Sequence, residues 1–200
     1  MGHKKNIGIF IFDDVEVLDF TGPFEVFSSA RISKKSQINI NRLQCPFSVF
    51  TFTEKKKFIT ASGGLVVKSM FTLKNCPSLD VLIIPGGIGT RVLLKNNSFL
   101  NWLSSKRNIS VVSSICTGAL LLAKVGMLRG KKATTHWGAL NLLKQISPST
   151  KVLKNKKFVF DTYYTSAGVS SGIDMSLHIL EKLIGKTAAK NTAKYIEYQY

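Results

Sequence analysis

Short apolar runs alternate with stretches of helical spacing along almost the whole chain, and no other feature of the sequence restricts the fold as strongly. This alternation is typical of βαβ units that build a mainly parallel sheet. Several runs are continuous in valine and isoleucine, as expected where helices cover both faces of the sheet. We therefore predict an α/β fold with a mainly parallel central sheet. The predicted strands are residues 7–12, 47–53, 81–85, 109–115, 158–160 and 163–166, and the predicted helices are residues 18–29, 99–105, 117–125, 138–146, 173–184 and 186–195.

The length and composition indicate a single globular domain. The 200 residues fit one domain, residues 1–200, since hydrophobic cores stop growing at roughly 250 to 300 residues. Apolar residues make up 44% of the chain and charged residues 20%, which is enough hydrocarbon for a sizeable core. The apolar run at residues 7–12 is far shorter than the ~20 residues that span a bilayer, and no secretory cleavage site follows it. We expect a cytoplasmic protein without a membrane partner.

The cysteines point to a reducing compartment. The three of them, Cys45, Cys76 and Cys116, cannot all pair within the chain. None lies in a CxxC motif or at a spacing typical of metal ligands. We therefore expect free thiols and no metal site.

The formal net charge of +17 is typical of nucleic-acid-binding proteins, because clustered cations release counterions from phosphate. Most of the cations here are lysines scattered along the chain, and arginine, which suits base and bidentate phosphate contacts, is scarce. The tight clusters are residues 55–57 and 156–157, both in predicted surface turns. We therefore favour a solvated, lysine-rich surface over a specific nucleic-acid site. Duplex DNA should bind weakly, without sequence preference and only at low salt.

The most unusual residue at a predicted strand end is Cys116. It lies in Ser114-Ile-Cys-Thr-Gly118, with small residues two positions before and after it. Open parallel sheets bind ligands at the carboxyl ends of their strands, and this spacing is that of a nucleophile elbow between a strand and a helix. A helix N-terminus beneath the sulfur would favour the thiolate. The alternative is a buried, inert cysteine, which remains the interpretation for Cys45 and Cys76.

Glycines follow the predicted strand at residues 81–85. Gly86 and Gly87 allow the backbone to approach a ligand and to aim N–H groups at it. The N–H groups of Gly87 and Thr117 are predicted to form a two-point oxyanion hole opposite Cys116. The alternative is a simple Pro-Gly turn.

Two further residues are candidates for proton transfer. Asp19 is an acid in an apolar stretch near the start of a predicted helix, and beside a thiolate one of the two groups should hold a proton. A protonated Asp19 would donate to the sulfur and act as a general acid, whereas the alternative is a helix cap. His136 ends a short predicted strand after the Cys116 helix, and on spacing alone a packed or surface histidine is the commoner interpretation.

Three strand-end segments together resemble the ThiJ/PfpI superfamily. They are Asp19-Phe-Thr-Gly-Pro23, Asp80-Val-Leu-Ile-Ile-Pro-Gly-Gly87 and Ile115-Cys-Thr-Gly-Ala119, and the resemblance extends through residues 126–137 and 165–175. Within the superfamily the resemblance is to isonitrile hydratases and to the N-terminal domains of AraC-type regulators. It implies a flavodoxin-like three-layer sandwich, related to class I glutamine amidotransferases. It also implies a homodimer, a site close to the subunit interface and no cofactor.

The resemblance also implies roles for single residues. In isonitrile hydratases the residues matching Cys116 and Asp19 are the nucleophile and its acid/base partner, and the threonine matching Thr117 also contributes. His136 matches a histidine found near the cysteine in many relatives. Protease-like and deglycase-like branches tend to carry a glutamate in place of Asp19, and the protease-like ones a histidine in place of Thr117. These departures count against peptidase and protein-repair chemistry.

Three functional hypotheses remain open from the sequence. The first is hydration of a small-molecule isonitrile to an N-substituted formamide by the Cys116 thiolate, with Asp19 as the proton carrier. The second is a small-molecule-sensing module related to the AraC-type regulators. These regulators carry a C-terminal helix-turn-helix domain, which we do not expect after the predicted helix at residues 186–195. The third is a redox response in which Cys116 is oxidised to a sulfinic acid.

Overall fold

The computed structural model describes residues 4–32 and 45–200. The strands are β1 (Lys5–Phe10), β2 (Phe47–Thr53), β3 (Phe58–Thr60), β4 (Val66–Lys68), β5 (Phe71–Thr72), β6 (Val81–Ile84), β7 (Val111–Ile115), β8 (Lys132–Ala133), β9 (Lys151–Val152), β10 (Phe158–Asp161) and β11 (Tyr163–Ser166). The α-helices are α1 (Val17–Ser28), α2 (Thr90–Leu93), α3 (Asn97–Ser104), α4 (Gly118–Lys124), α5 (Leu140–Ile146), α6 (Ser171–Ile184) and α7 (Lys186–Tyr195). Short 3-10 helices span Ser62–Gly64 and Trp137–Ala139. None of the helices in the described ranges has the length and apolar character of a membrane span.

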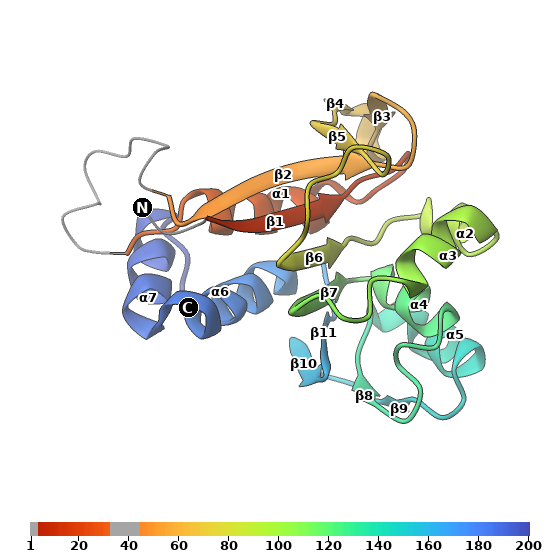
Figure 1. Ribbon diagram of the computed structural model, residues 1–200. Coiled ribbons are helices and arrows are strands. Elements are labelled where there is room, and N and C mark those ends of the chain that lie inside the picture. The colour runs from red at the N-terminus through yellow and green to blue at the C-terminus, as the bar shows by residue number, and fades with distance from the viewer. Residues whose placement is uncertain (1–3, 33–44) are drawn as a thin grey trace.

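The centre of the molecule is a seven-stranded sheet with the order β10-β11-β7-β6-β1-β2-β5 (Figure 1). Neighbouring strands in it are parallel except β10 and β11, which form an antiparallel pair at one edge. Two small sheets, β3-β4 and β8-β9, lie outside it. The predicted α/β fold with a mainly parallel sheet is confirmed.

Helices cover both faces of the central sheet. On one face, α1 packs against β1 and β2 and contacts α6, which also contacts α7 and β11 (Figure 1). On the other, α4 packs against β7 and contacts α2, α3 and α5. Strand β6, in the middle, consists of four fully buried aliphatic residues, as expected for a strand covered on both sides. The arrangement is the predicted three-layer sandwich.

An aromatic cluster fixes α3, and with it the preceding α2, beside the ends of β1 and β2. The ring centroids of Phe10 on β1 and Phe99 on α3 are 4.5 Å apart. Trp102 of α3 and Phe52 of β2 contact the same Phe10 ring. Such aromatic pairs contribute about 0.5–1.5 kcal/mol each beyond the burial of their area. This packing positions the loops that follow β1 and β6 at one edge of the sheet.

The observed boundaries differ slightly from the predicted ones. Strand β2 and helix α7 have the predicted bounds, whereas β1 starts and ends two residues earlier than predicted, and Ile11 and Phe12 lie buried in the loop that follows it. The predicted helix at residues 138–146 begins as a 3-10 turn and becomes α-helical at Leu140. The short strand predicted to end at His136 is observed as β8, which ends at Ala133. The prediction missed α2, β3, β4, β5 and β9, which are too short to show a periodic pattern.

Candidate active site

Cys116 occupies a sharp turn between β7 and α4. Its φ of +53° lies in the left-handed region, which costs a non-glycine residue roughly 1–2 kcal/mol. Gly118 is needed for this turn, because a Cβ there would lie 2.1 Å from the Ile84 carbonyl oxygen. The Cys116 N–H donates to the Ser166 carbonyl at 3.1 Å and so ties the turn to β11. The predicted elbow between a strand and a helix is therefore confirmed.

Two glycines enclose the Cys116 side chain. A Cβ added at Gly168 would lie 2.5 Å from Cys116 Cβ, and one added at Gly86 would lie 2.8 Å from the same atom. Only glycine lets both backbone segments approach so closely. As a result Cys116 is only 7% exposed. Sequence reasoning singled out Gly86 but missed Gly168, which belongs to no motif that marks a close approach.

Asp19 lies in the first turn of α1 and is fully buried. Its Oδ2 accepts a hydrogen bond from the Gly86 N–H at 2.9 Å, and its Oδ1 is buried with no hydrogen-bond partner among the described residues. Burial raises the pKa of Asp19 from 3.8 to about 7, although interactions with the Gly86 N–H and with the Cys116 thiol oppose the rise. The helix-cap alternative is wrong, because Glu16 is the N-cap residue and the Asp19 side chain binds another segment.

The Cys116 thiol and the Asp19 carboxyl affect each other's protonation. Burial, and next the charge of Asp19, raise the pKa of Cys116 to about 12, against hydrogen bonding from Thr117. This raised pKa runs against the expectation of a favoured thiolate, because burial and the Asp19 charge outweigh the hydrogen bonds from Thr117. Above about pH 7 the carboxyl is ionised and the pair holds one proton, which lies on the sulfur. The sequence predicted a protonated Asp19, whereas these pKa directions favour the proton on Cys116.

The glycine N–H groups after β6 are not free to bind an oxyanion. The Gly87 N–H donates to Thr117 Oγ1 at 3.0 Å, and the Gly86 N–H donates to Asp19. The predicted hole between Gly87 and Thr117 is therefore closed in this structure, because two acceptors within the site already take these donors. The backbone N–H of Thr117 interacts with the Cys116 sulfur and partly offsets the rise in its pKa. Thr117 therefore contacts the thiol directly and acts to lower its pKa.

His136 is half-buried and is not joined to Cys116. Its Nδ1 accepts a hydrogen bond from the Gly138 N–H at 3.3 Å, and its ring lies against Trp137 with the centroids 5.2 Å apart. The residue of this segment that reaches the elbow is Thr135, whose hydroxyl donates to the Cys116 carbonyl at 2.7 Å. Sequence reasoning missed Thr135, because a threonine beside a histidine carries no separate signal for the contact.

Three neighbouring residues of the site supply the groups needed for proton transfer and for nucleophilic attack by sulfur. These groups are a thiol, a carboxyl with a raised pKa, and the N–H and hydroxyl groups of Thr117. A thiol next to a base can form a covalent bond to an electrophilic carbon while the base carries its proton. Within the described ranges, no three His, Cys, Asp or Glu side chains are grouped as metal ligands would be.

The fold and the site define a class of α/β sandwich proteins that carry a cysteine on a strained turn beside a buried carboxyl. Residues 5–182 match the DJ-1/PfpI family, and the chain belongs to this family. It is 31% identical over 193 residues to isonitrile hydratase from Pseudomonas putida, covering 96% of this chain and 78% of that protein. The resemblance predicted from the strand-end segments is therefore confirmed.

Regulators and solved structures of the same fold are also similar to the chain. It is 23% identical over 200 residues to the HTH-type transcriptional regulator GbdR from Pseudomonas aeruginosa. The match covers 98% of this chain but 52% of the regulator, so the chain spans about half of the regulator's length. The crystal structure of a ThiJ/PfpI family protein from Pseudomonas syringae matches with a TM-score of 0.85 at 25% identity, covering 99% of this chain and 76% of that one.

Proposed function

We propose that this protein is a cysteine-dependent enzyme that hydrates an isonitrile to an N-substituted formamide. The observation that carries the proposal is the buried Asp19 carboxyl, whose raised pKa and unpartnered Oδ1 make it a proton acceptor for the Cys116 thiol. The 31% identity to an isonitrile hydratase supports the same reaction. The substrate would be a small molecule, and Cys116, Asp19 and Thr117 would act on it.

The first step adds the thiol across the isonitrile carbon, which accepts a nucleophile and a proton on the same atom. The Cys116 sulfur forms a bond to this carbon, and its proton passes through the Asp19 carboxylate to the same carbon. The product is a thioimidate, in which the carbon carries one hydrogen, the sulfur and a double bond to nitrogen. Because the pKa of the resting thiol is raised to about 12, Asp19 must take the proton as the sulfur attacks.

The second step hydrolyses the thioimidate. Water attacks its carbon while Asp19 accepts a proton from the water, and the nitrogen gains a proton. Cleavage of the carbon–sulfur bond then returns the thiol and releases the formamide, so that one isonitrile and one water give one product. The Thr117 N–H, which interacts with the sulfur, would stabilise the negative charge on the sulfur as it leaves.

A substrate panel tests the proposal most simply. Alkyl and aryl isonitriles, with glyoxals and peptides as controls, would be incubated with the wild type, Cys116→Ala and Cys76→Ala, and formamide would be quantified. Cys76 is a half-buried free cysteine outside the site, so Cys76→Ala is the matched control. We expect formamide from the wild type and Cys76→Ala, and only the uncatalysed amount from Cys116→Ala. Absence of isonitrile turnover by the wild type, or full activity of Cys116→Ala, would contradict the proposal.

The second candidate is a small-molecule-sensing module that binds the same class of ligand without turnover. The similarity to GbdR and the 7% exposure of Cys116, whose raised pKa disfavours the thiolate, favour it. A sensing module would show an isonitrile-dependent rise in melting temperature, equal in the wild type and Cys116→Ala, with no formamide. A redox role is less favoured, because oxidation of cysteine proceeds through the thiolate and the raised pKa of Cys116 keeps that form scarce at neutral pH.

A further inference from the structure

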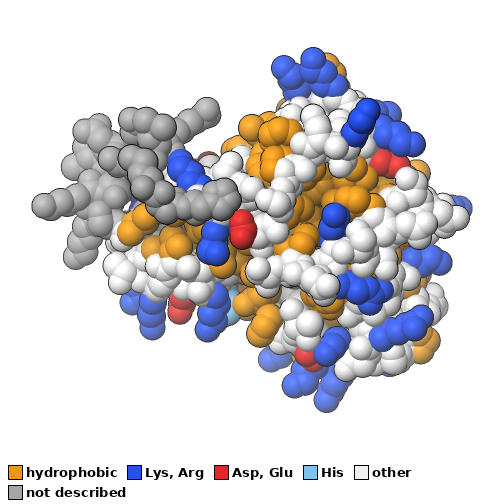
Figure 2. All heavy atoms as spheres, in the orientation of Figure 1, with side chains coloured by type: hydrophobic (Ala, Val, Ile, Leu, Met, Phe, Trp, Pro, Cys, Tyr) orange, Lys and Arg blue, Asp and Glu red, His pale blue; other side chains and the backbone are white. Residues whose placement is uncertain are grey.

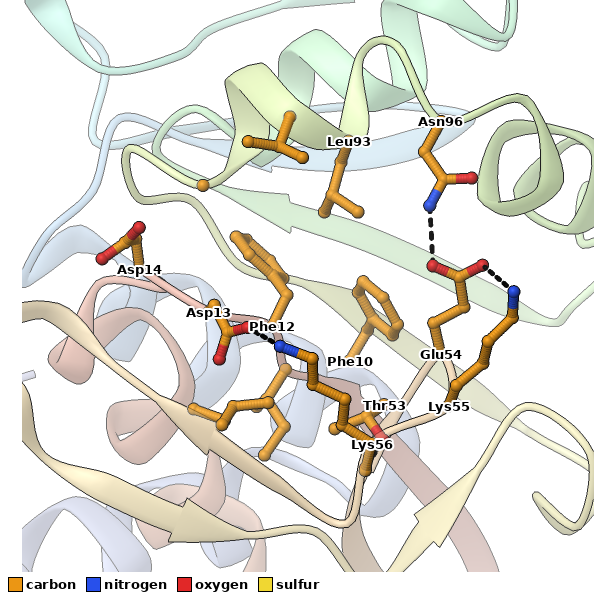
Figure 3. A pocket seen from close by; sticks show the side chains of 14 residues that line it. Phe10, Phe12, Asp13, Asp14, Thr53, Glu54, Lys55, Lys56, Leu93 and Asn96 are labelled. Atoms are coloured by element: carbon orange, nitrogen blue, oxygen red, sulfur yellow. Dashed lines mark hydrogen bonds and ion pairs between the residues drawn. The ribbon is translucent and has the colours of Figure 1, made fainter.

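A cavity of about 450 Å³ opens at the carboxyl ends of β1 and β2, beside α2. Figure 3 shows its apolar floor, to which β1 contributes Phe10, the following loop Phe12, and α2 Leu93. All three residues are buried members of the hydrophobic core, as is Ile59 of β3, which also lines the cavity. From outside, Figure 2 shows apolar side chains at the surface of this part of the molecule, with lysine and arginine side chains around them. The cavity is therefore an opening into the core.

This cavity is separate from the candidate active site. Neither Cys116 nor Asp19 is among the residues that line it. The loop at residues 86–90 lies between the two sites, since its Gly87 binds Thr117 and its Gly89 lines the cavity. The wall at Gly89 is closely packed, because a Cβ there would lie 2.0 Å from the Asp13 carbonyl oxygen. A ligand in the cavity would thus occupy a second site.

Four of the five charged side chains that line the cavity form ion pairs with one another, and the fifth, Asp14, is exposed to solvent. Lys56 Nζ lies 2.5 Å from the carboxylate of Asp13 (Figure 3). Glu54 accepts a hydrogen bond from Asn96 Nδ2 at 2.7 Å, and Lys55 Nζ lies 3.8 Å from the same carboxylate. An ionic ligand would have to compete with these contacts and lose its own hydration. An uncharged ligand would leave the contacts in place and bury its apolar surface on the floor.

We propose that this cavity is a binding site for an uncharged, mainly apolar small molecule of one or two rings. Small-ligand sites are usually cavities of about 300–1,000 Å³ with apolar walls and a few polar groups at the edge, as here. Removal of apolar ligand surface from water supplies about 25 cal/mol per Å². The proposal rests on the lining and the rim alone and does not depend on isonitrile hydration.

Three naphthalene derivatives that share one aromatic body test the proposal. Naphthalenemethanol is neutral, naphthoate is an anion and naphthylmethylammonium is a cation, and equilibrium dialysis against the full chain would measure their affinity and stoichiometry. Val92→Trp is the blocking variant, because Val92 lines the cavity and is 72% exposed, so that a larger side chain fills the mouth without entering the core. Val66→Trp on β4 is the matched control, at a 63% exposed position outside the lining.

We expect naphthalenemethanol to bind at one site per chain and more tightly than either ion. Val92→Trp should weaken this binding at least about tenfold, which corresponds to about 1.4 kcal/mol. Val66→Trp and Cys116→Ala should bind as the wild type does, so that loss of turnover and loss of binding remain distinguishable. Melting temperatures would verify that all variants are folded. Equal affinity of Val92→Trp and wild type, tighter binding of an ion, or no saturable binding of the neutral probe would each overturn the proposal.

Discussion

The Cys116 site and the cavity lie at neighbouring strand ends of the same sheet, yet their polar groups are satisfied to different degrees. At the first site a φ of +53° at Cys116 and an unpartnered Asp19 oxygen both disfavour the folded state. At the second, Lys56 pairs with Asp13 and holds the pKa of that carboxyl below its ordinary value. Position at the carboxyl edge of a parallel sheet therefore does not define the role of a site by itself. Unsatisfied groups suit a reaction in which protonation changes, and paired groups suit binding without reaction.

The largest expected difference between the two sites concerns turnover. Asp19→Asn keeps the size of the side chain but removes the proton carrier, so isonitrile turnover should fall by about 100- to 10,000-fold. Asp13→Asn, on the rim of the cavity, should leave turnover unchanged. Steady-state formamide production at saturating isonitrile would measure both. If Asp19→Asn turned over isonitrile as fast as the wild type, Asp19 would have no part in the mechanism.

The same two variants should change stability in opposite directions. The pKa of Asp19 is raised from 3.8 to about 7 in the folded state, so its contribution to stability is full below its unfolded pKa and is lost as the pH rises through 7. At about pH 8 the neutral Asp19→Asn should therefore be more stable than the wild type, by up to about 4 kcal/mol at about 1.4 kcal/mol per pKa unit. The difference should vanish near pH 4, which urea unfolding at both pH values would measure.

Asp13→Asn should change the stability of the protein in the opposite direction. Its carboxyl has a lowered pKa through Lys56, so the contribution of this ion pair is present above the unfolded pKa and is lost as the pH falls. Because the pair is exposed, Asp13→Asn should destabilise the protein by about 1 kcal/mol or less. Stabilisation by Asp13→Asn, or destabilisation by Asp19→Asn at about pH 8, would contradict the expected difference in stability between the two sites.

A smaller effect is expected from the glycine that covers Cys116. Gly168 and Gly130 both have a φ of +69°, but a Cβ at Gly130 would meet nothing within 4 Å. Gly130→Ala should therefore cost only the backbone strain, about 1 kcal/mol. Gly168→Ala should cost about 1–3 kcal/mol more, because its Cβ would overlap Cys116, and should also lower turnover. Urea unfolding would compare the two, and equal losses of stability would show that the contact with Cys116 is loose.

Sequence reasoning could predict the parts of the site that depend on local order along the chain. The elbow at Cys116 follows from a strand, small residues and a helix in succession, and Asp19 stands out as an acid in an apolar stretch. The direction of the Cys116 pKa could not be predicted, because it depends on how deeply the side chain is buried between Gly86 and Gly168. The state of the Gly87 N–H likewise depends on a hydroxyl from another segment.

The cavity could not be predicted at all, for a related physical reason. Its lining comes from the ends of β1 and β2, from β3 and from α2, and the last two elements are too short to leave a periodic pattern. Phe10 and Phe12 on its floor were predicted as ordinary residues of the strand at 7–12, and Leu93 belongs to α2, which the sequence did not predict. Only the packing of α2 and α3 beside these strand ends leaves the space between them open.

The most direct test concerns the claim that Cys116 keeps the proton while Asp19 is ionised. Thiolates absorb in the ultraviolet, so the difference in absorbance between the wild type and Cys116→Ala reports the ionisation of this one sulfur as the pH is raised. Because burial and the Asp19 charge raise the pKa of Cys116 to about 12, we expect no thiolate step through neutral pH, and a step at lower pH in Asp19→Asn than in the wild type. A wild-type thiolate already formed below about pH 7 would contradict the shared-proton arrangement and restore a resting thiolate nucleophile.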